Sequence, residues 1–405
     1  MEFIREKIKE KPISKRRIMM RVGIAALCGL AFVLAVCIAL LIAIPLIKNK
    51  LQTDNNGIST ESEMETDSTE NIGLVIPPDL NLSVNDYQTL QDELYRIGNV
   101  ANKSIVIVTQ MENEKDWLTN DYEKSGQGSG LIIGEDGNYI YILTERKSIV
   151  DAAHIRVSFA DGTGTEARIL RYDGNTGMAV VTVEKRNVKP NTYRELRVAK
   201  LGSMQPVVNG SIVIALGSPV GANYSILTGN ITSVENEVLT KDKNYSVFTT
   251  DIAASKNGSG VLINTNGEVI GIVMQTFSGS QDGSTLTAVA YTELAGLIEQ
   301  LKNGKSVPYI GAYISTITDA ISEEYEIPKG VFIREVAMDS PAMKAGLQSG
   351  DVITHINGDA VITDEMYSEK LSQLIPGTTC EISVKRQNGN EYYEVKCTVT
   401  IGVLE

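Results

Sequence analysis

The sequence predicts a protein that is dominated by β-strands and preceded by a single transmembrane helix. Between residues 104 and 297, short apolar runs alternate with turn signals such as Asp161-Gly162 and Asp173-Gly174, and few segments have helical periodicity. This pattern is typical of an all-β barrel or sandwich. The expected strands are 104–108, 130–133, 140–144, 155–159, 167–171, 179–183 and 211–215.

The transmembrane helix is expected at residues 22–47, an uncharged apolar run. As a helix it would be about 39 Å long, enough to cross a hydrocarbon core of roughly 30 Å. Residues 1–21 hold eight Lys or Arg and three Glu, and a basic flank favours a cytoplasmic N-terminus. A cleaved signal peptide has a shorter apolar core. We therefore expect a single-pass anchor in the cell membrane, with all later residues outside the cytoplasm.

Residues 48–82 are expected to form an acidic, disordered linker. Positions 51–80 hold seven Asp or Glu and no Lys or Arg, a composition that cannot bury a core. The formal net charge of the chain is −13. Nucleic-acid binders carry an excess of basic residues, and this chain does not. The sequence also has no cluster of ligand side chains at metal-site spacing and no phosphate-binding loop. We expect no nucleic-acid partner, no metal site and no cofactor.

One serine lies between two glycines just ahead of an apolar strand, in Asn257-Gly258-Ser259-Gly260-Val261. Flanking glycines allow main-chain N–H groups to point at a developing oxyanion, so Ser259 is a candidate nucleophile. The stretch resembles, in altered form, the nucleophile loop of the HtrA/Do (DegP-like) family of trypsin-like serine proteases. Further similar stretches follow the family's order: 128–133, 157–162, 215–221, 228–234 and 293–301. The resemblance implies a chymotrypsin-like pair of six-stranded β-barrels over residues 83–304, with the active site between them.

The same resemblance locates the other catalytic positions. Lys147, three residues after Thr144, stands where the family has its histidine, and Gly177 stands where it has its aspartate. Asn257 replaces the glycine that would donate the second N–H of the oxyanion hole. Two of the three triad residues are therefore replaced.

A serine hydroxyl without a base stays protonated, and losing any triad member removes most of the rate. Of the two histidines, His154 is expected on the surface and His355 lies in the C-terminal domain. We therefore expect a protease fold that is kept as a scaffold, inactive or impaired in proteolysis. The alternative is an active serine endopeptidase in which Lys147 is the base, which requires the lysine to be buried.

Residues 305–405 are expected to form a second domain, because 330–336, 339–353 and 356–358 resemble a PDZ domain, with 366–374 as its helix. A PDZ domain captures peptides by strand addition and holds the terminal carboxylate in a loop. The resemblance assigns this site to Tyr309, Ile310, Gly311, Ala312, Ile314, Tyr367 and Leu371. The expected partners are peptides or protein C-termini. Many relatives are trimers, which leaves a homotrimer open.

Cys380 and Cys397 lie at equal sequence distances from the turn signal Asn388-Gly389. If the strands pair regularly around that turn, the two cysteines face each other, and outside the cytoplasm they could form a disulfide. Two separate buried thiols are the other interpretation, since one bulge changes the register.

Overall fold

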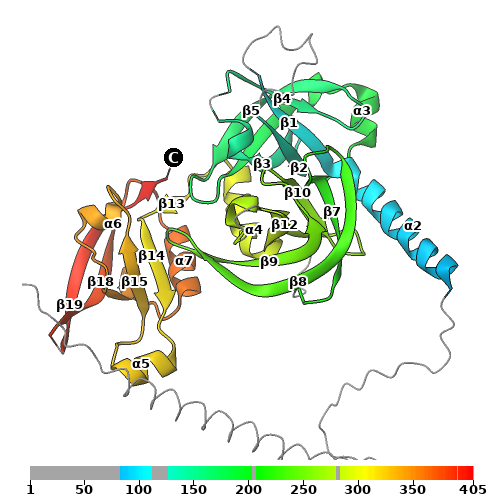
Figure 1. The fold of residues 1–405 in the computed structure, drawn as a ribbon. Coiled ribbons are helices and arrows are strands. Elements are labelled where there is room, and N and C mark those ends of the chain that lie inside the picture. Colours follow the sequence, from blue (N-terminus) through cyan, green and yellow to red (C-terminus); the bar gives the residue numbers. More distant parts are fainter. Residues whose placement is uncertain are drawn as a thin grey trace, which may run out of the picture. The chain divides into compact units, whose positions relative to one another are not determined.

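The computed structural model describes residues 83–111, 126–150, 152–202, 207–279, 283–389 and 391–404. Most of them belong to two closed β-barrels and a C-terminal domain with an open sheet (Figure 1). The expected tail, anchor and linker at 1–21, 22–47 and 48–82 lie outside this part of the chain. Within it, no helix is both long and apolar enough to cross a membrane.

The first barrel closes in the order β1-β2-β3-β6-β5-β4. Its strands are β1 (Ile105–Met111), β2 (Gln127–Glu135), β3 (Tyr139–Glu145), β4 (His154–Ser158), β5 (Gly164–Tyr172) and β6 (Met178–Glu184). Alternate side chains of a strand point to one face. Val106 and Val108 of β1 therefore both lie in the same buried core cluster, with Ile142, Val157 and Val181 from other strands.

The second barrel closes in the order β10-β11-β12-β9-β8-β7. Its strands are β7 (Ile212–Ser218), β8 (Ser225–Leu239), β9 (Asn244–Ala253), β10 (Ser259–Ile263), β11 (Val269–Val273) and β12 (Thr285–Ala290). Val213, Ala215, Leu262, Leu286 and Ala288 belong to its core cluster, and none of the five is exposed. The two six-stranded barrels implied by the resemblance are therefore present.

The barrels share a third core, which places β2 beside β10. Leu131 of β2 and Leu143 of β3 pack there with Val261 of β10 and Ile272 of β11. The helix α4 (Tyr291–Lys302) buries Leu294 and other residues of one face in the same cluster. An active site between the barrels would lie at this junction.

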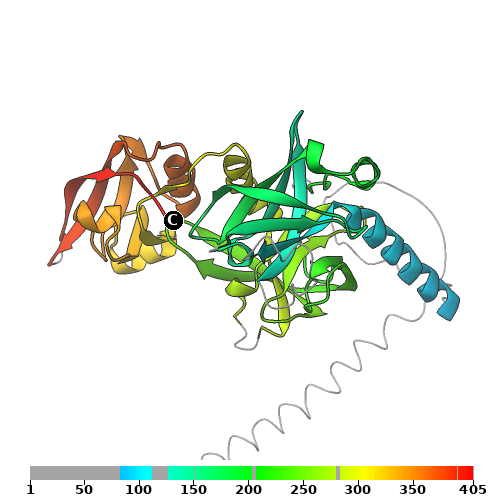
Figure 2. The same ribbon diagram turned by 90° about the horizontal axis from the view of Figure 1, so that it is seen from above.

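A long helix precedes the first barrel. It is α2 (Val84–Ala101), which begins at a capping box between Ser83 and Asp86. Only Leu94 and Gly98 of this helix are buried, and the helix extends away from the barrels (Figures 1 and 2). A short turn, η1 (Asn102–Ser104), joins this helix to β1. Further short helical segments connect the strands: η4 (Arg146–Ser148), η5 (Lys185–Asn187), α3 (Pro190–Glu195) and η6 (Gln275–Phe277).

The C-terminal domain has one sheet in the order β14-β15-β16-β18-β19, with β17 paired to β16, and a separate β13-β20 pair. Its elements are β13 (Pro308–Tyr309), β14 (Ala312–Thr316), α5 (Asp319–Tyr325), β15 (Val331–Val336), α6 (Pro341–Lys344), β16 (Val352–Ile356), β17 (Asp359–Ala360), α7 (Asp364–Ser372), β18 (Thr379–Asn388), β19 (Glu391–Thr400) and β20 (Gly402–Val403). Inside it, Arg386 forms a two-pronged ion pair with the buried Asp351, both N–O distances being 2.7 Å.

Of the two interpretations of Cys380 and Cys397, the one in which they face each other is wrong. Asn388 pairs with Glu391, so the turn lies one residue later than the Asn388-Gly389 signal indicated. Cys380 therefore faces Val399, and Cys397 faces Ile382. Both cysteines are buried and carry free thiols, and burial raises the pKa of Cys380 to about 11. The second interpretation, two separate buried thiols, is the one that the register supports.

This register predicts the reactivity of the two cysteines. Purified without reductant, the chain should leave both Cys380 and Cys397 unreactive to maleimide while folded, because the thiols are buried and protonated. Both should react fully once urea unfolds the chain. Mass spectrometry of proteolytic peptides reports each site separately, with a reductant-treated sample as control. Labelling of these sites only after reduction would mean that a disulfide forms.

Candidate active site and peptide-binding site

Ser259 is the first residue of β10 and lies at the junction of the two barrels. Its Cα pairs with Ser218 of β7, and the residue is only 2% exposed. The following Gly260 has φ +139°, and a Cβ there would lie 2.0 Å from the carbonyl oxygen of Leu216. Because no other residue type fits this backbone, Gly260 fixes the direction from which Ser259 enters the strand.

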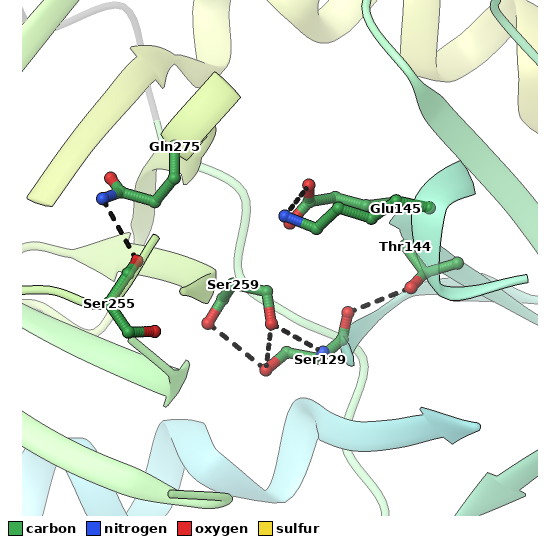
Figure 3. A network of polar contacts seen from close by, with 7 residues as sticks. Ser129, Thr144, Glu145, Ser255, Ser259 and Gln275 are labelled. Carbon is green, nitrogen blue, oxygen red and sulfur yellow. Dashed lines mark hydrogen bonds and ion pairs between the residues drawn. The ribbon is translucent and has the colours of Figure 1, made fainter. Parts of the chain in front are cut away.

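The hydroxyl of Ser259 forms hydrogen bonds with another serine, Ser129 (Figure 3). The main-chain N–H of Ser129, in β2, donates to Ser259 Oγ at 2.9 Å, and Ser259 Oγ donates to Ser129 Oγ at 3.2 Å. Ser129 Oγ in turn lies 3.3 Å from the carbonyl oxygen of Ser259. A neutral hydroxyl is a poor proton acceptor, so this contact orients Ser259 without activating it.

Lys147 lies in η4 and is paired with a carboxylate. Its Nζ is 2.7 Å from Glu145 Oε2, and its side chain is 35% exposed. Burial raises the pKa of Glu145, and the neighbouring Lys147 opposes that rise. The contact directs Lys147 Nζ toward Glu145, and a lysine acts as a base only where burial removes its proton. The burial that a lysine base requires is not met here.

Gly177 occupies the loop between β5 and β6 with φ +73°, and its carbonyl accepts the N–H of Arg146 at 2.7 Å. The carboxylate of this loop belongs to Asp173, which is buried and accepts from the main chain and the hydroxyl of Thr176 at 2.9 and 2.7 Å. Asp173 therefore stabilises its own turn. No carboxylate is available from position 177 to orient a base.

Asn257 lies in an exposed turn ahead of Ser259. Main-chain bonds hold this turn: the N–H of Gly258 donates to Ser255 at 2.8 Å, and the N–H of Ser255 donates to Pro219 at 2.9 Å. The buried Gln275 adds a longer bond of 3.4 Å to the carbonyl of Ser255. These hydrogen bonds hold the turn that contains Asn257, the residue predicted at the oxyanion position.

The two histidines lie elsewhere. His154 begins β4, and its Nδ1 is 3.2 Å from Glu166 on β5, with about a third of the side chain exposed. His355 is exposed on β16 and contacts Thr354. Their partners show that neither imidazole serves Ser259, as the sequence predicted.

The predicted peptide-binding residues are brought together. Ile310, Ala312, Ile314, Tyr367 and Leu371 are buried in one core cluster. Tyr309 is half-buried, and Gly311 adopts φ +89°, where a Cβ would collide with Ser340 at 2.5 Å.

Their N–H groups already have an acceptor. Ile310 and Gly311 donate to Oδ2 of Asp242 at 2.8 and 2.7 Å, and Ala312 donates to Oδ1 at 3.0 Å. The hydroxyl of Tyr367 donates to Oδ1 at 2.8 Å. Burial raises the pKa of Asp242, while the three N–H bonds and Tyr367 act in the opposite direction.

Sequence reasoning missed Ser129, Glu145 and Asp242. A signal for Ser129 exists, because Gly128-Ser129-Gly130 repeats the Gly-Ser-Gly tripeptide around Ser259. The serines of both tripeptides lie in strands, β2 and β10, that meet at the barrel junction. Glu145 lies only two residues before Lys147, but nothing in the sequence shows that the two side chains pair. Asp242 carries no comparable signal, because its partners lie in a distant segment.

Two domain families match the chain. Residues 128–272 match the trypsin-like peptidase domain, and residues 308–397 match the PDZ domain. Together with the two barrels and the open sheet, these matches define a trypsin-like peptidase fold followed by a PDZ domain.

Curated relatives refine this class. The chain is 32% identical over 286 residues to the probable periplasmic serine endoprotease DegP-like of Halomonas elongata, covering 69% of this chain and 57% of that protein. It is 33% identical over 288 residues to the protein of the same name from Pseudomonas savastanoi pv. phaseolicola, with 70% and 57% covered. The chain belongs to the HtrA family, although the match spans little more than half the length of these relatives.

Solved structures show the same fold. The HtrA-type protease AlgW with decapeptide superposes with a TM-score of 0.54 at 22% identity, covering 76% of this chain and 98% of that one. The serine endoprotease from Yersinia pestis gives a TM-score of 0.52 at 23% identity, covering 77% and 98%.

The backbone conformation of Gly260 predicts that a side chain at this position destabilises the fold. Gly260→Ala should lower the free energy of unfolding by about 2–4 kcal/mol, because it adds a strained φ and a main-chain collision. Gly296→Ala is the matched control, because that glycine lies in α4 with open space around it. Alanine there should raise the free energy of unfolding by about 1 kcal/mol at most. Urea unfolding of the purified chain in mild detergent measures both. If the two variants were equally stable, Ser259 could not be held in the conformation described.

Proposed function

We propose that this protein is an extracytoplasmic, membrane-tethered member of the HtrA family whose peptidase domain is inactive or impaired in proteolysis. Its barrels serve as a scaffold, and its PDZ domain binds peptides or protein C-termini. The observation that carries the proposal is the environment of Ser259 Oγ, which donates its hydrogen bond to Ser129 Oγ and not to a base.

The surroundings of Ser259 support impaired catalysis at each position that acyl transfer needs. The residue in the place of the base, Lys147, is engaged by Glu145. The residue in the place of the orienting aspartate, Gly177, has no side chain. A triad that lacks its base and its orienting residue loses most of its rate advantage, because proton removal and attack can no longer be concerted.

Peptide binding is supported by the loop Tyr309–Ala312, whose N–H groups converge on one carboxylate. This is the geometry by which PDZ domains hold a C-terminus. The chain resembles proteins named as periplasmic endoproteases, which agrees with a location outside the cytoplasm. The anchor at 22–47 and a homotrimeric assembly remain parts of the proposal that rest on the sequence and the family.

The second candidate function is an active serine endopeptidase. It is favoured by the intact Ser259 on its glycine-flanked turn and by the names of the relatives, which are serine endoproteases. In that case Lys147 would have to leave Glu145, lose its proton and reach Ser259.

The two functions differ in a protease assay. The purified chain should cleave casein no faster than its Ser259→Ala variant, and a fluorophosphonate probe should leave residue 259 unlabelled. The expected deficit is about 10⁴-fold or more relative to an active HtrA peptidase assayed in parallel, because no base removes the serine proton. Intact-mass spectrometry detects the label, and gel densitometry follows casein.

Two further variants sharpen this assay. Lys147→Ala should change nothing if the scaffold proposal is right, whereas it should abolish cleavage if lysine is the base. Casein cleavage that both Ser259→Ala and Lys147→Ala remove would refute the scaffold proposal in favour of the endopeptidase.

A further inference from the structure

The turn between β8 and β9 of the second barrel, residues Thr240–Lys243, lies along β14 of the PDZ domain. The main-chain N–H of Asp242 donates to the carbonyl of Ala312 at 2.7 Å, and Lys241 forms an antiparallel bridge with Tyr313. Just beyond the turn, the side-chain amide of Asn244 donates to the carbonyl of Ile314 at 3.1 Å. The segment therefore begins to add a strand to the free edge of the PDZ sheet, as a peptide ligand does.

The side chain of Asp242 completes the likeness to a ligand. Its two oxygens accept hydrogen bonds from the three N–H groups of the loop Ile310–Ala312 and from the hydroxyl of Tyr367. All four contacts are donors directed at the carboxyl, and the residue is only 6% exposed. A C-terminal carboxylate needs the same N–H groups, so it and Asp242 cannot bind together.

A peptide bound to a PDZ domain lies in a groove between β14 and α7, and α7 also contacts this turn. Ser368 on α7 donates its hydroxyl to the carbonyl oxygen of Asp242 at 3.0 Å. Asp242 thus contacts both the strand and the helix between which a peptide would lie. Asp242 itself has φ +63°, a left-handed conformation that aspartate tolerates better than most residues.

The first barrel also holds the β8–β9 turn in place. Asn175, in the loop between β5 and β6, donates to the hydroxyl of Thr240 at 3.0 Å and to the carbonyl of Lys241 at 2.8 Å. Its side-chain oxygen accepts the N–H of Lys241 at 3.2 Å. The turn is therefore presented to the PDZ groove in a preformed shape, which lowers the entropic cost of occupying it.

We propose that Asp242 is a built-in ligand of the PDZ domain, so that a peptide with a free C-terminal carboxylate binds only by displacing the β8–β9 turn. This inference rests on the proposed peptide-binding function and adds its regulation. The PDZ groove of the resting chain is closed by its own peptidase domain, and removing the carboxylate of Asp242 opens it.

Two variants of the full chain in mild detergent test the proposal. Asp242→Gly removes the carboxylate and suits the positive φ, and Asp242→Asn keeps the shape and the left-handed preference but loses the charge. Lys241→Ala is the matched control, because it alters the same turn and leaves the carboxylate in place. Thermal unfolding of each variant verifies that it is folded.

The first readout needs no external ligand. Hydrogen exchange, followed by mass spectrometry of peptides that cover residues 308–314, reports the N–H groups of the loop. Exchange there should be at least tenfold faster in Asp242→Gly than in the wild type, with Asp242→Asn between them and Lys241→Ala unchanged.

The second readout uses a decapeptide library that is attached by its N-termini, has its last four positions randomised, and is made with free carboxylates and as amides. Asp242→Gly should bind the free-carboxylate members at least tenfold more tightly than the wild type does, and the amides should show no gain. Equal binding by the two proteins, with unchanged exchange at 310–312, would overturn the built-in ligand and leave peptide binding intact. Faster exchange in Asp242→Gly without any peptide binding would keep the built-in ligand and refute the proposed peptide-binding function.

Discussion

The contact on which the interpretation of this molecule depends joins two serines across the barrel junction. Ser129 on β2 supplies an N–H to the hydroxyl of Ser259 and receives its proton in a hydrogen bond. Acyl transfer by serine requires an acceptor that holds the proton strongly when the hydroxyl attacks, and a second hydroxyl does not do so. The pair therefore stabilises the junction of β2 and β10. In an active serine protease, the hydroxyl at this place would instead be the nucleophile.

The packing of the barrels does not depend on the residues at positions 147 and 177. The barrels close around aliphatic clusters such as that of Val106, Ile142 and Val181, and the junction is filled by Leu131, Val261 and their neighbours. Burying such side chains contributes about 1.5–3 kcal/mol each, whatever stands at positions 147 and 177. Replacing a triad residue at the surface of this core therefore removes chemistry and leaves the architecture in place.

Local patterns in the sequence predicted the strands, because alternation of apolar residues is a property of neighbouring residues. Motif spacing predicted replacements at two triad positions, and these stay a prediction. The register of β18 and β19 was predicted wrongly: the Asn388-Gly389 signal is local, but Asn388 pairs with Glu391, which shifts every partner of Cys380. The contact of Ser129 has only the repeated Gly-Ser-Gly tripeptide as a signal, and the contacts of Asp242 have none, because each joins segments that are far apart in the chain. Such contacts are set by barrel closure and by the docking of the β8–β9 turn on β14, and neither leaves a periodic trace in the sequence.

A built-in ligand also decides which peptides can compete. An intramolecular ligand acts at an effective concentration of the order of millimolar, so a peptide that offers only a terminal carboxylate gains nothing over Asp242. Both would bond the same N–H groups of Ile310, Gly311 and Ala312. The advantage has to come from contacts that the turn lacks, namely further strand pairing along β14 and the packing of a terminal side chain. Selectivity at this groove therefore rests on the difference between two ligands and not on the carboxylate that they share.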